Sequence, residues 1–372
     1  MTRPVDIAVV GAGIAGASLA AEVAPHASVL LIEGEDQPGY HSTGRSAAFW
    51  SETYGGPLIQ PLTSASWPLL SGPPEDFHES PFLKRRGAIH IADNGGLAVL
   101  EKLAARFEGS IQLERMTRGD LAAAIPGLRE GWNAGFLERS CADIDVAALH
   151  SAYLRQARGR GAVLVTGARL QRAERLPAGW SLMTSGGSFE AKLLVNAAGA
   201  WADEVAQMAG VAPLGIQPYR RTIVQLRVDP PAPADLALVI DASGRFYFKP
   251  EAGGRLWLSP HDESPCAAGD CAAEELDVAL AIDRLQQVVD WKVDRVEHSW
   301  AGLRSFAPDR LPVYGFAAGH PDFFWCAGQG GFGIQTAPAA AKLAAALLLG
   351  RAPDPLVAHI DPEPYAPGRL MN

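Results

Sequence analysis

A glycine-rich turn between an apolar run and a helical segment constrains the fold of this chain more than any other feature. Gly11, Gly13 and Gly16 stand in the sequence GAGIAG, after the apolar run of residues 5–10 and at the start of a helical pattern over residues 14–23. In such a turn the first glycine allows the tight bend, the second lets the backbone approach a pyrophosphate, and the third lets the helix pack closely on the strand. The pattern predicts a dinucleotide-binding fold, with the diphosphate at the N-terminus of the helix.

Glu33 supports this prediction from the end of the next apolar run, residues 28–32, which completes a βαβ unit. At this distance from the glycines, a carboxylate at the end of the second strand accepts hydrogen bonds from a ribose. Ile14 and Ala15 complete the turn and belong to the same expected binding surface. Glycines used only for tight packing are the weaker alternative.

Length and composition limit the classes of protein that fit. With 372 residues, of which 48% are apolar and 20% charged, the chain is expected to form two domains that share a cleft. No apolar run reaches the roughly 18 residues of a membrane-spanning helix, so a soluble, cytoplasmic protein is expected. The net charge of −9 argues against a nucleic-acid partner, which requires a basic surface.

The four cysteines give no sign of a metal site or a disulfide framework. Cys141, Cys266, Cys271 and Cys326 have neither CxxC spacing nor sufficient density, so we expect reduced thiols and no metal. Cys266 and Cys271 are the one pair for which an interaction stays open.

A second glycine-rich segment distinguishes FAD from NAD. Residues 326–336 read CAGQGGFGIQT and open a long helix. In a flavoenzyme such a helix end can face the pyrimidine side of the isoalloxazine, where negative charge accumulates on reduction and the helix dipole is favourable. One FAD can use both glycine-rich helix starts, whereas a glycine-rich surface loop is the alternative.

The rest of the chain alternates between the two expected domains. Between residues 80 and 140 the pattern predicts one strand at 86–91 and helices at 98–106 and 118–124; a helix with an acidic N-cap follows at 145–158. Strands are expected within residues 161–170, 193–201, 219–228, 236–240, 245–248, 255–258, 300–306 and 323–326. Helices are expected at residues 274–291 and 332–349.

Six segments together resemble one family. The strings GAGIAGAS, QPGYHSTGRSAA, LLVNAAGAW, WAGLRSFAPDRLPVYG and GQGGFGIQT, with Glu33, occur in the order found in the superfamily of D-amino-acid oxidase and glycine oxidase. Within that superfamily the chain is most similar to the bacterial FAD-dependent D-arginine dehydrogenases. The resemblance covers nearly the whole chain.

This resemblance implies an α/β fold with a Rossmann-like FAD-binding domain built from discontinuous segments, and an α+β substrate domain with an antiparallel sheet. Residues 1–79, 141–218 and 299–372 would form the FAD-binding domain, and residues 80–140 and 219–298 the substrate domain. Since no cysteine lies within residues 300–304, where related sarcosine oxidases attach their flavin, noncovalent FAD is expected.

The resemblance also implies which residues contact FAD, in addition to the glycine turn and Glu33. These are Ser42, Thr43, Arg45, Ser46, Ala197, Gly199, Gly331, Gly333, Ile334, Gln335 and Thr336.

Two arginines match the family's positions for binding a substrate carboxylate, for which a bidentate guanidinium is suited. These are Arg304 in WAGLRSF and Arg221 in PYRRTIV. Because alternate side chains of a strand point to opposite faces, only one of Arg220 and Arg221 can enter the site, and the resemblance favours Arg221. Surface ion pairs are the alternative for both arginines.

Tyr247, Tyr54 and Gly331 complete the expected catalytic set. The two tyrosines match residues that contact substrate in the resembling enzymes, and burial as core aromatics is the alternative. Tyr54 precedes two glycines, so a mobile lid is conceivable. His41, His90 and His298 lack a partner pattern and are expected to be solvent-facing or hydrogen-bonded rather than catalytic bases.

The expected reaction is oxidation of a D-amino acid by hydride transfer from Cα to flavin N5, giving an imino acid that hydrolyses to a keto acid and ammonia. Oxidation of a secondary amine or 2-hydroxy acid, and a noncatalytic flavin-binding module, are the alternatives. The electron acceptor is a quinone or oxygen, with a quinone favoured.

Two departures from the family point to a neutral substrate. The acidic residue that holds a substrate guanidinium appears as Gly87, and a histidine near the flavin appears as Phe49. Loss of a buried carboxylate removes a charge-assisted contact worth roughly 1.5–3 kcal/mol. A neutral, bulky or cyclic amino acid is therefore expected rather than a basic one.

Overall fold

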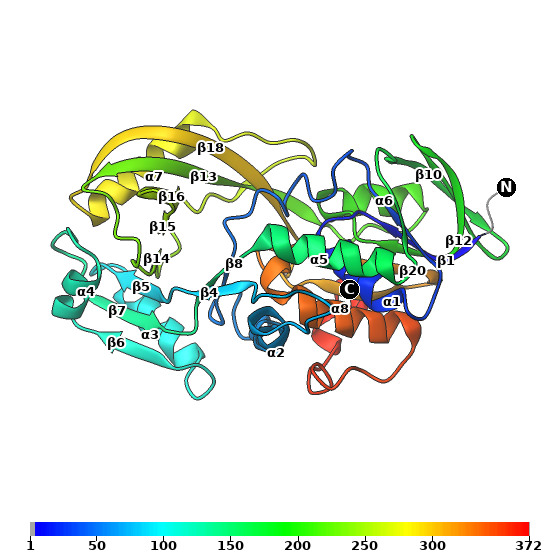
Figure 1. Ribbon diagram of the computed structural model, residues 1–372, viewed down its shortest axis with the longest axis horizontal. Coiled ribbons are helices and arrows are strands. Elements are labelled where there is room, and N and C mark those ends of the chain that lie inside the picture. Colours follow the sequence, from blue (N-terminus) through cyan, green and yellow to red (C-terminus); the bar gives the residue numbers. More distant parts are fainter. Residues whose placement is uncertain (1–3, 372) are drawn as a thin grey trace.

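The computed structural model describes residues 4–371, which form two large β-sheets and one small sheet with helices around them (Figure 1). The first sheet has eight strands in the order β10-β11-β12-β1-β2-β9, with β20 beside β12 and β19 beside β20. Its strands are β1 (Val5–Val10), β2 (Val29–Ile32), β9 (Val163–Val165), β10 (Leu170–Leu176), β11 (Gly179–Thr184), β12 (Gly187–Asn196), β19 (Val313–Ala317) and β20 (His320–Ala327).

The centre of this sheet is parallel and buried on both faces. β1 runs parallel to β2 and β12, and β12 runs parallel to β20. Ile7 and Val9 pack toward one layer of helices, whereas Ala8 and Val10 pack toward the other side, because successive side chains alternate across a strand. The first layer comprises α1 (Ile14–Val23), α2 (Gln60–Ser71), α5 (Val146–Gly159) and α8 (Gly333–Leu349); η1 (Gly199–Trp201) and α6 (Ala202–Met208) are on the other side.

The turn between β1 and α1 thus lies at the carboxyl edge of parallel strands, where open α/β sheets bind ligands. α1 packs against both α5 and α8, which contribute small side chains to the same core. The segments that form this core come from both ends of the chain, as the blue and red ribbons in Figure 1 show.

The second sheet has ten strands in the order β21-β18-β13-β16-β15-β14-β5-β7-β6, with β17 beside β13. Its strands are β5 (Ala88–Ala92), β6 (Leu113–Met116), β7 (Ala134–Glu138), β13 (Gln217–Asp229), β14 (Leu238–Asp241), β15 (Tyr247–Glu251), β16 (Arg255–Ser259), β17 (Ser264–Pro265), β18 (Lys292–Phe306) and β21 (Gln329–Gly330). All its pairings are antiparallel except that of β14 with β5. Helices α3 (Leu97–Arg106), α4 (Arg118–Ala124) and α7 (Glu275–Val288) pack on it, and its core is separate from those of the first sheet.

The long antiparallel pair of β13 and β18 connects the two halves of the molecule (Figure 1). β18 ends beside β21, which immediately precedes α8. The small sheet of β3 (Phe49–Trp50), β4 (Leu83–Arg85) and β8 (Ala142–Ile144) lies at the junction, and the chain ends in the short helices η2 (Glu363–Tyr365) and η3 (Pro367–Leu370).

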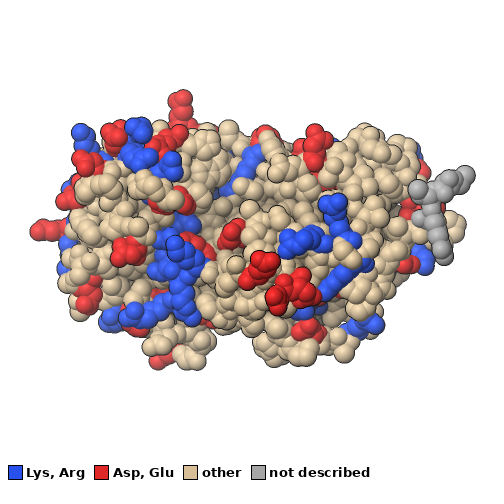
Figure 2. Space-filling model, viewed as in Figure 1, with Lys and Arg blue, Asp and Glu red and all other residues tan. Residues whose placement is uncertain are grey.

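Basic and acidic side chains are mostly mixed on the face shown in Figure 2, with one basic group left of its centre. In the described chain, several exposed basic and acidic side chains form ion pairs, such as Arg115 with Glu101. Exposed pairs of this kind each stabilise the fold by about 0–1 kcal/mol.

The expected fold class is confirmed, and several elements agree closely with their predictions. The helices predicted at residues 14–23 and 118–124 have those bounds as α1 and α4, and Asp145 caps α5 by accepting a hydrogen bond from the Ala148 amide (2.9 Å). The expected domain boundaries at 218/219 and 298/299 fall inside the continuous strands β13 and β18. The division into two domains stays a prediction.

Between residues 80 and 145 the predicted helices are present as α3 and α4, but the strands were predicted incompletely. The strand expected at 86–91 begins only at Ala88, as β5, because Gly87 has a φ of +78° that is incompatible with an extended strand; β4, which ends at Arg85, was not predicted. The strands β6, β7 and β8 were not predicted. They are three to five residues long, and Glu138 and Asp143, placed within them, are strand-disfavouring residues that pair with groups distant in sequence.

Candidate active site

One deep cavity, here called the main cavity, extends from the turn between β1 and α1 to the β13–β18 pair. It contains about 1590 Å3 of space free of protein atoms, including its open mouth. Most residues that the sequence predicts for cofactor and substrate line it. They are Gly11, Gly13, Ile14, Ala15, Glu33, Ser42, Thr43, Arg45, Ser46, Ala197, Gly199, Arg221, Tyr247, Arg304, Gly331, Gly333 and Ile334.

Four predicted residues do not line the main cavity. Gly16 instead packs α1 on the preceding turn, since a Cβ there would lie 1.9 Å from the Gly11 carbonyl oxygen. Thr336 is buried and donates a hydrogen bond from its hydroxyl to the Phe332 carbonyl (2.9 Å). Gln335 and Tyr54 line a smaller neighbouring cavity, described below.

The glycine turn has the shape that a pyrophosphate needs. Gly11 has φ +100°, and a Cβ there would lie 2.4 Å from the carbonyl oxygen of Ala197 on the neighbouring strand end. Gly13 precedes α1, so its lack of a side chain keeps the helix N-terminus open to the cavity. The start of α1, with the positive end of the helix dipole, thus lines the cavity, which favours an anion there.

Glu33 is held in place by backbone amides on either side. Its Oε2 accepts a hydrogen bond from the Ala12 amide (2.8 Å), and its Oε1 accepts one from the Glu35 amide (3.0 Å). A carboxylate has about four acceptor positions, so lone pairs remain for the hydroxyl groups of a ribose.

The segment of residues 42–46 forms the wall opposite α1. The Thr43 hydroxyl accepts a hydrogen bond from the Ile14 amide (3.0 Å), which caps α1 from outside, and the Ser42 hydroxyl donates to the Leu303 carbonyl (2.7 Å). Arg45 lies at the cavity, but its guanidinium already pairs with Asp270 (2.5 Å) and the Cys271 carbonyl (3.0 Å). Residues 270–271 are thereby fixed against the wall of the main cavity.

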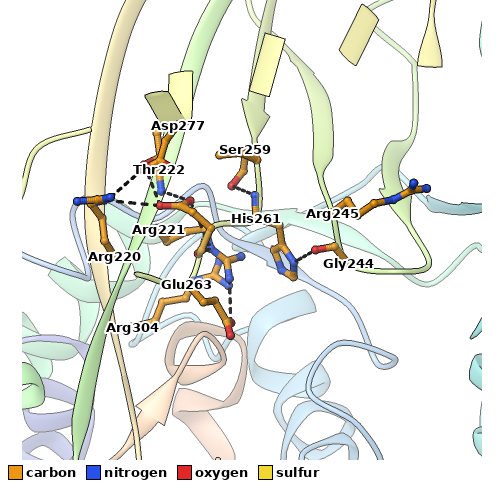
Figure 3. Close-up of polar contacts among 12 residues, drawn as sticks. Arg220, Arg221, Thr222, Gly244, Arg245, Ser259, His261, Glu263, Asp277 and Arg304 are labelled. Carbon is orange, nitrogen blue, oxygen red and sulfur yellow. Dashed lines mark hydrogen bonds and ion pairs between the residues drawn. The ribbon is translucent and has the colours of Figure 1, made fainter. Parts of the chain in front are cut away.

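Arg221 and Arg304 project from neighbouring strands into the main cavity (Figure 3). In the register of β13 and β18, Arg221 lies opposite Gly302, so Arg304 two residues further is on the same face. Arg220 lies on the other face, where it pairs with Glu274 and Asp277 of the α7 region. Of the two neighbouring arginines, Arg221 lines the main cavity and Arg220 does not.

The two guanidinium groups have little compensating charge. Arg221 is 3% exposed; it donates from Nε to the Asp262 carbonyl (2.7 Å) and from Nη2 to Glu263 (3.0 Å), while its Nη1 is buried without a hydrogen-bond partner. Glu263 is shared with Arg310. Burial and then the nearby charge of Arg304 lower the pKa of Arg221, although a guanidinium stays charged at neutral pH. An anion between the two arginines would relieve this imbalance.

The smaller neighbouring cavity, here called the small cavity, lies between Tyr54, Tyr247, Phe49 and the start of α8. The rings of Tyr54 and Tyr247 lie 5.2 and 5.7 Å from that of Phe49, and the Tyr54 hydroxyl accepts a hydrogen bond from Arg304 Nη1. A Cβ on Gly331 would lie 2.8 Å from the Tyr54 hydroxyl and 3.0 Å from Arg304 Nη1. Gly331 therefore keeps the space between the tyrosine and the arginine open.

Of the residues considered for other roles, Gly87, Lys249, His298 and His90 line neither cavity. Gly87 is buried. Lys249 donates to Asp143 (2.8 Å), and His298 stacks on Trp300. His90 is buried and bonds to Glu138 (3.2 Å). His41 lines the main cavity but bonds to Glu35 (3.0 Å).

The sequence analysis missed three residues of this region, of which Trp201 and Arg169 line the main cavity. Trp201 and Arg169 lie at the end near Glu35, with the Arg169 guanidinium 5.4 Å from the indole centre. Trp201 was visible as the last residue of LLVNAAGAW, a segment that was used only for its strand. His261, after β16, has φ +56° and packs its ring edge against Tyr247. No local pattern marks it.

His261 predicts a dependence of stability on pH. Burial, reinforced by the charges of Arg221 and Arg304, lowers its pKa to about 2, so the ring is neutral and Nδ1 donates to the Gly244 carbonyl (2.6 Å, Figure 3). The unfolded chain, with an ordinary histidine pKa of about 6.5, binds a proton that the folded chain excludes. This contribution to stability is full above pH about 6.5 and decreases as the pH falls toward about 2.

We expect His261→Asn, which tolerates a positive φ, to flatten the decrease in unfolding free energy between about pH 6.5 and 4. Denaturant unfolding at a series of pH values measures this, with His26→Asn on the exposed surface as control. An unchanged slope in His261→Asn would contradict the assignment.

Within residues 4–371, no helix is long and apolar enough to cross a bilayer, and no group of three or more His, Cys, Asp or Glu side chains could hold a metal ion. Cys266 and Cys271 are both free thiols.

Comparisons with known proteins identify the family. Residues 6–347 match the family model described as DAO, FAD dependent oxidoreductase, so the chain belongs to this family of FAD-dependent oxidoreductases. It is 29% identical to glycine oxidase of Pseudomonas aeruginosa, over 98% of this chain and 99% of that protein, and 26% identical to glycine oxidase of Geobacillus kaustophilus, over 94% of each. The crystal structure of the Geobacillus kaustophilus glycine oxidase superimposes with a TM-score of 0.85 at 23% identity, over 98% of both chains.

The use of FAD and the relation to glycine oxidase and D-amino-acid oxidase are thus confirmed. The closer similarity to D-arginine dehydrogenases stays a prediction, as do the roles of the individual site residues.

Proposed function

We propose that this FAD-dependent oxidoreductase oxidises the Cα–N bond of a small neutral amino acid, of D configuration where Cα is chiral, and releases an imino acid that hydrolyses to a keto acid and ammonia. One observation carries the proposal: Arg221 and Arg304 face the same cavity. In the described chain the carboxylates paired with Arg221 are Glu263, which Arg310 shares, and Asp262, which lies 4.0 Å from its Nε and already bonds to Thr222. An α-carboxylate is the anion that fits, since a guanidinium binds it through two parallel hydrogen bonds.

The main cavity fits FAD in its chemistry. The α1 N-terminus suits the diphosphate, the fixed Glu33 suits the ribose, and the start of α8 lies at the cavity through Gly331, Gly333 and Ile334. None of the four cysteines lines the main cavity within the described chain, which supports noncovalent binding. When bound, FAD supplies the two-electron acceptor for the substrate hydride.

The side chains of the protein then bind and orient the substrate. Arg304 and Arg221 hold the carboxylate, and the Tyr54 hydroxyl, bonded to Arg304, adds a polar contact on the same side. Tyr247, which lines both cavities, fixes the remaining orientation of Cα. Positioning of this kind lowers the barrier because the reacting atoms are held in line and water is excluded.

The cavity walls near the two arginines favour a substrate with a neutral side chain. Phe49, Ala47 and Ile334 are apolar, and the acidic residues that line the main cavity, Glu33, Glu35 and Glu204, belong to the segments at its other end. The glycine oxidases to which the chain is similar support a small substrate. The electron acceptor, a quinone or oxygen, stays a prediction.

Anaerobic mixing with a panel of amino acids tests the proposal. We expect glycine or a small neutral D-amino acid to bleach the flavin absorbance fastest and to release one ammonia per flavin reduced, with D-arginine and D-lysine slower. Fastest reduction by a basic amino acid would overturn the neutral substrate. Flavin reduction without release of ammonia would indicate that the substrate is a secondary amine or a 2-hydroxy acid. If no amino acid, secondary amine or 2-hydroxy acid reduces the flavin, the protein is a noncatalytic flavin-binding module.

A further inference from the structure

Glu138, at the end of β7, is the most completely buried carboxylate near the site, with 0% of its surface exposed. It lines neither cavity and cannot touch FAD or substrate there. A buried charge is costly unless hydrogen bonds satisfy it, so its partners show what it stabilises.

Residues 51–54 are here called the Tyr54 segment. Within the described chain, all the hydrogen bonds that Glu138 accepts from outside its own sheet come from residues 51–53 of this segment. Oε1 accepts from the Glu52 amide (2.7 Å), and Oε2 accepts from the hydroxyls of Ser51 (3.0 Å) and Thr53 (2.7 Å). His90, diagonal to Glu138 on β5, bonds to Oε2 (3.2 Å). Although burial opposes ionisation, the bonds from His90, Thr53 and Glu52 lower the pKa of Glu138, so the carboxylate is charged at neutral pH.

The Tyr54 segment is held from the other side by α8. Gln335 donates from Nε2 to the Tyr54 carbonyl (3.2 Å), and its Oε1 accepts from the Ser51 amide (3.2 Å). The Glu52 carboxylate also accepts from Ser64 (2.6 Å) and Ser140 (3.0 Å). Although Gly55 and Gly56 follow, the residues up to Tyr54 are thus fixed between the two sheets.

At the end of this segment, the Tyr54 hydroxyl accepts from Arg304 Nη1, and its ring packs between those of Phe49 and Phe332. Within the described chain, three residues of the second sheet form hydrogen bonds with the Tyr54 segment. They are Glu138, His90 and Arg304. Glu138, together with His90, therefore links strands β5 and β7 to the segment that contacts the arginine.

We propose that Glu138 is a positioning residue that fixes the Tyr54 segment, so that the Tyr54 hydroxyl orients Arg304 for a substrate carboxylate. The inference rests on the proposed function only for the identity of the ligand. It makes Tyr54 part of a fixed wall rather than of a mobile lid.

Hydrogen–deuterium exchange of the FAD-loaded protein tests whether Glu138 fixes the Tyr54 segment. In Glu138→Gln one oxygen becomes an NH2 group that cannot accept from the Ser51 and Thr53 hydroxyls or from the Glu52 amide. We expect amides of residues 50–56 to exchange about tenfold faster, equivalent to about 1.4 kcal/mol. Asp241→Asn is the matched control, because Asp241 is also a buried carboxylate of this sheet but bonds to Arg245. It should leave these amides unchanged.

Binding of acetate, measured by calorimetry in a double-mutant cycle, tests whether Glu138 acts through Tyr54 on the binding of a carboxylate. We expect Glu138→Gln and Tyr54→Phe each to weaken acetate binding about tenfold, and the double variant to bind no more weakly than Tyr54→Phe alone. A purely structural role would instead lower the thermal stability of Glu138→Gln and Asp241→Asn alike and give additive losses. If Glu138→Gln fails to fold, Thr53→Val removes one donor to the same oxygen and should show the same pattern at smaller size.

Unchanged exchange in residues 50–56, or additive losses in the cycle, would overturn the inference. Failure of the proposed function looks different: the unmodified protein would bind no acetate, and Glu138→Gln would still accelerate exchange in the Tyr54 segment.

Discussion

Arg304→Leu is expected to lower kcat/KM for the best amino-acid substrate by about 1000-fold, or roughly 4 kcal/mol, with FAD still bound. Arg304 lines the main cavity, and its guanidinium donates a hydrogen bond to the Tyr54 hydroxyl. Without this guanidinium, a bound substrate carboxylate would lose its charged partner in the cavity. Arg304→Lys should recover part of the loss, because a lysine keeps the charge but not the two parallel hydrogen bonds.

Steady-state kinetics and the flavin content of the purified variants measure this. Arg220→Leu is the matched control, since Arg220 is also a partly buried arginine of the β13–β18 pair but bonds to Glu274 and Asp277 on the opposite face. It should lower stability and leave kcat/KM within about threefold. A loss in Arg304→Leu no larger than in Arg220→Leu would show that Arg304 does not bind substrate.

Gly11→Ala is expected to give a protein that purifies without FAD or does not fold. The added methyl group would lie 2.4 Å from the Ala197 carbonyl oxygen and 3.0 Å from the Ala198 Cα, both backbone atoms that cannot move aside without shifting β12. The φ of +100° adds backbone strain of about 1–2 kcal/mol.

Gly210→Ala separates strain from collision. Gly210 has φ +66° and lines neither cavity, and a Cβ there would meet no atom within 4 Å. We expect this variant to lose only about 1–2 kcal/mol of stability and to keep its flavin. Flavin absorbance per protein and the melting temperature measure both variants, and normal flavin content in Gly11→Ala would contradict the proposed diphosphate site.

The sequence predicted those parts of the fold that depend on local patterns. The turn of Gly11, Gly13 and Gly16, the spacing to Glu33 and the apolar period of α1 each reflect a constraint within about 25 residues, so one sequence suffices to read them. The same holds for Asp145 as the cap of α5. Arg304 and Arg221 were predicted from the family resemblance, and strand alternation added that only one of Arg220 and Arg221 can enter the site.

What the sequence did not predict depends on contacts between distant segments. β7 was missed, yet it supplies Glu138, whose partners lie some 85 residues earlier in the chain. Arg45 matched the family pattern, but Asp270 and Cys271 engage its guanidinium from the other end of the chain. His261 has a positive φ, and its ring packs on Tyr247 and bonds to the Gly244 carbonyl. No local pattern reports such neighbours.

The most direct test of the central claim compares the best amino acid of the panel with the same amine lacking its carboxylate, under anaerobic stopped-flow conditions. If Arg304 and Arg221 bind the carboxylate, the amino acid reduces the flavin about 1000-fold more efficiently than the decarboxylated amine, and Arg304→Leu removes most of that preference. Equal rates for the two compounds, in the unmodified protein and in Arg304→Leu alike, would contradict the account.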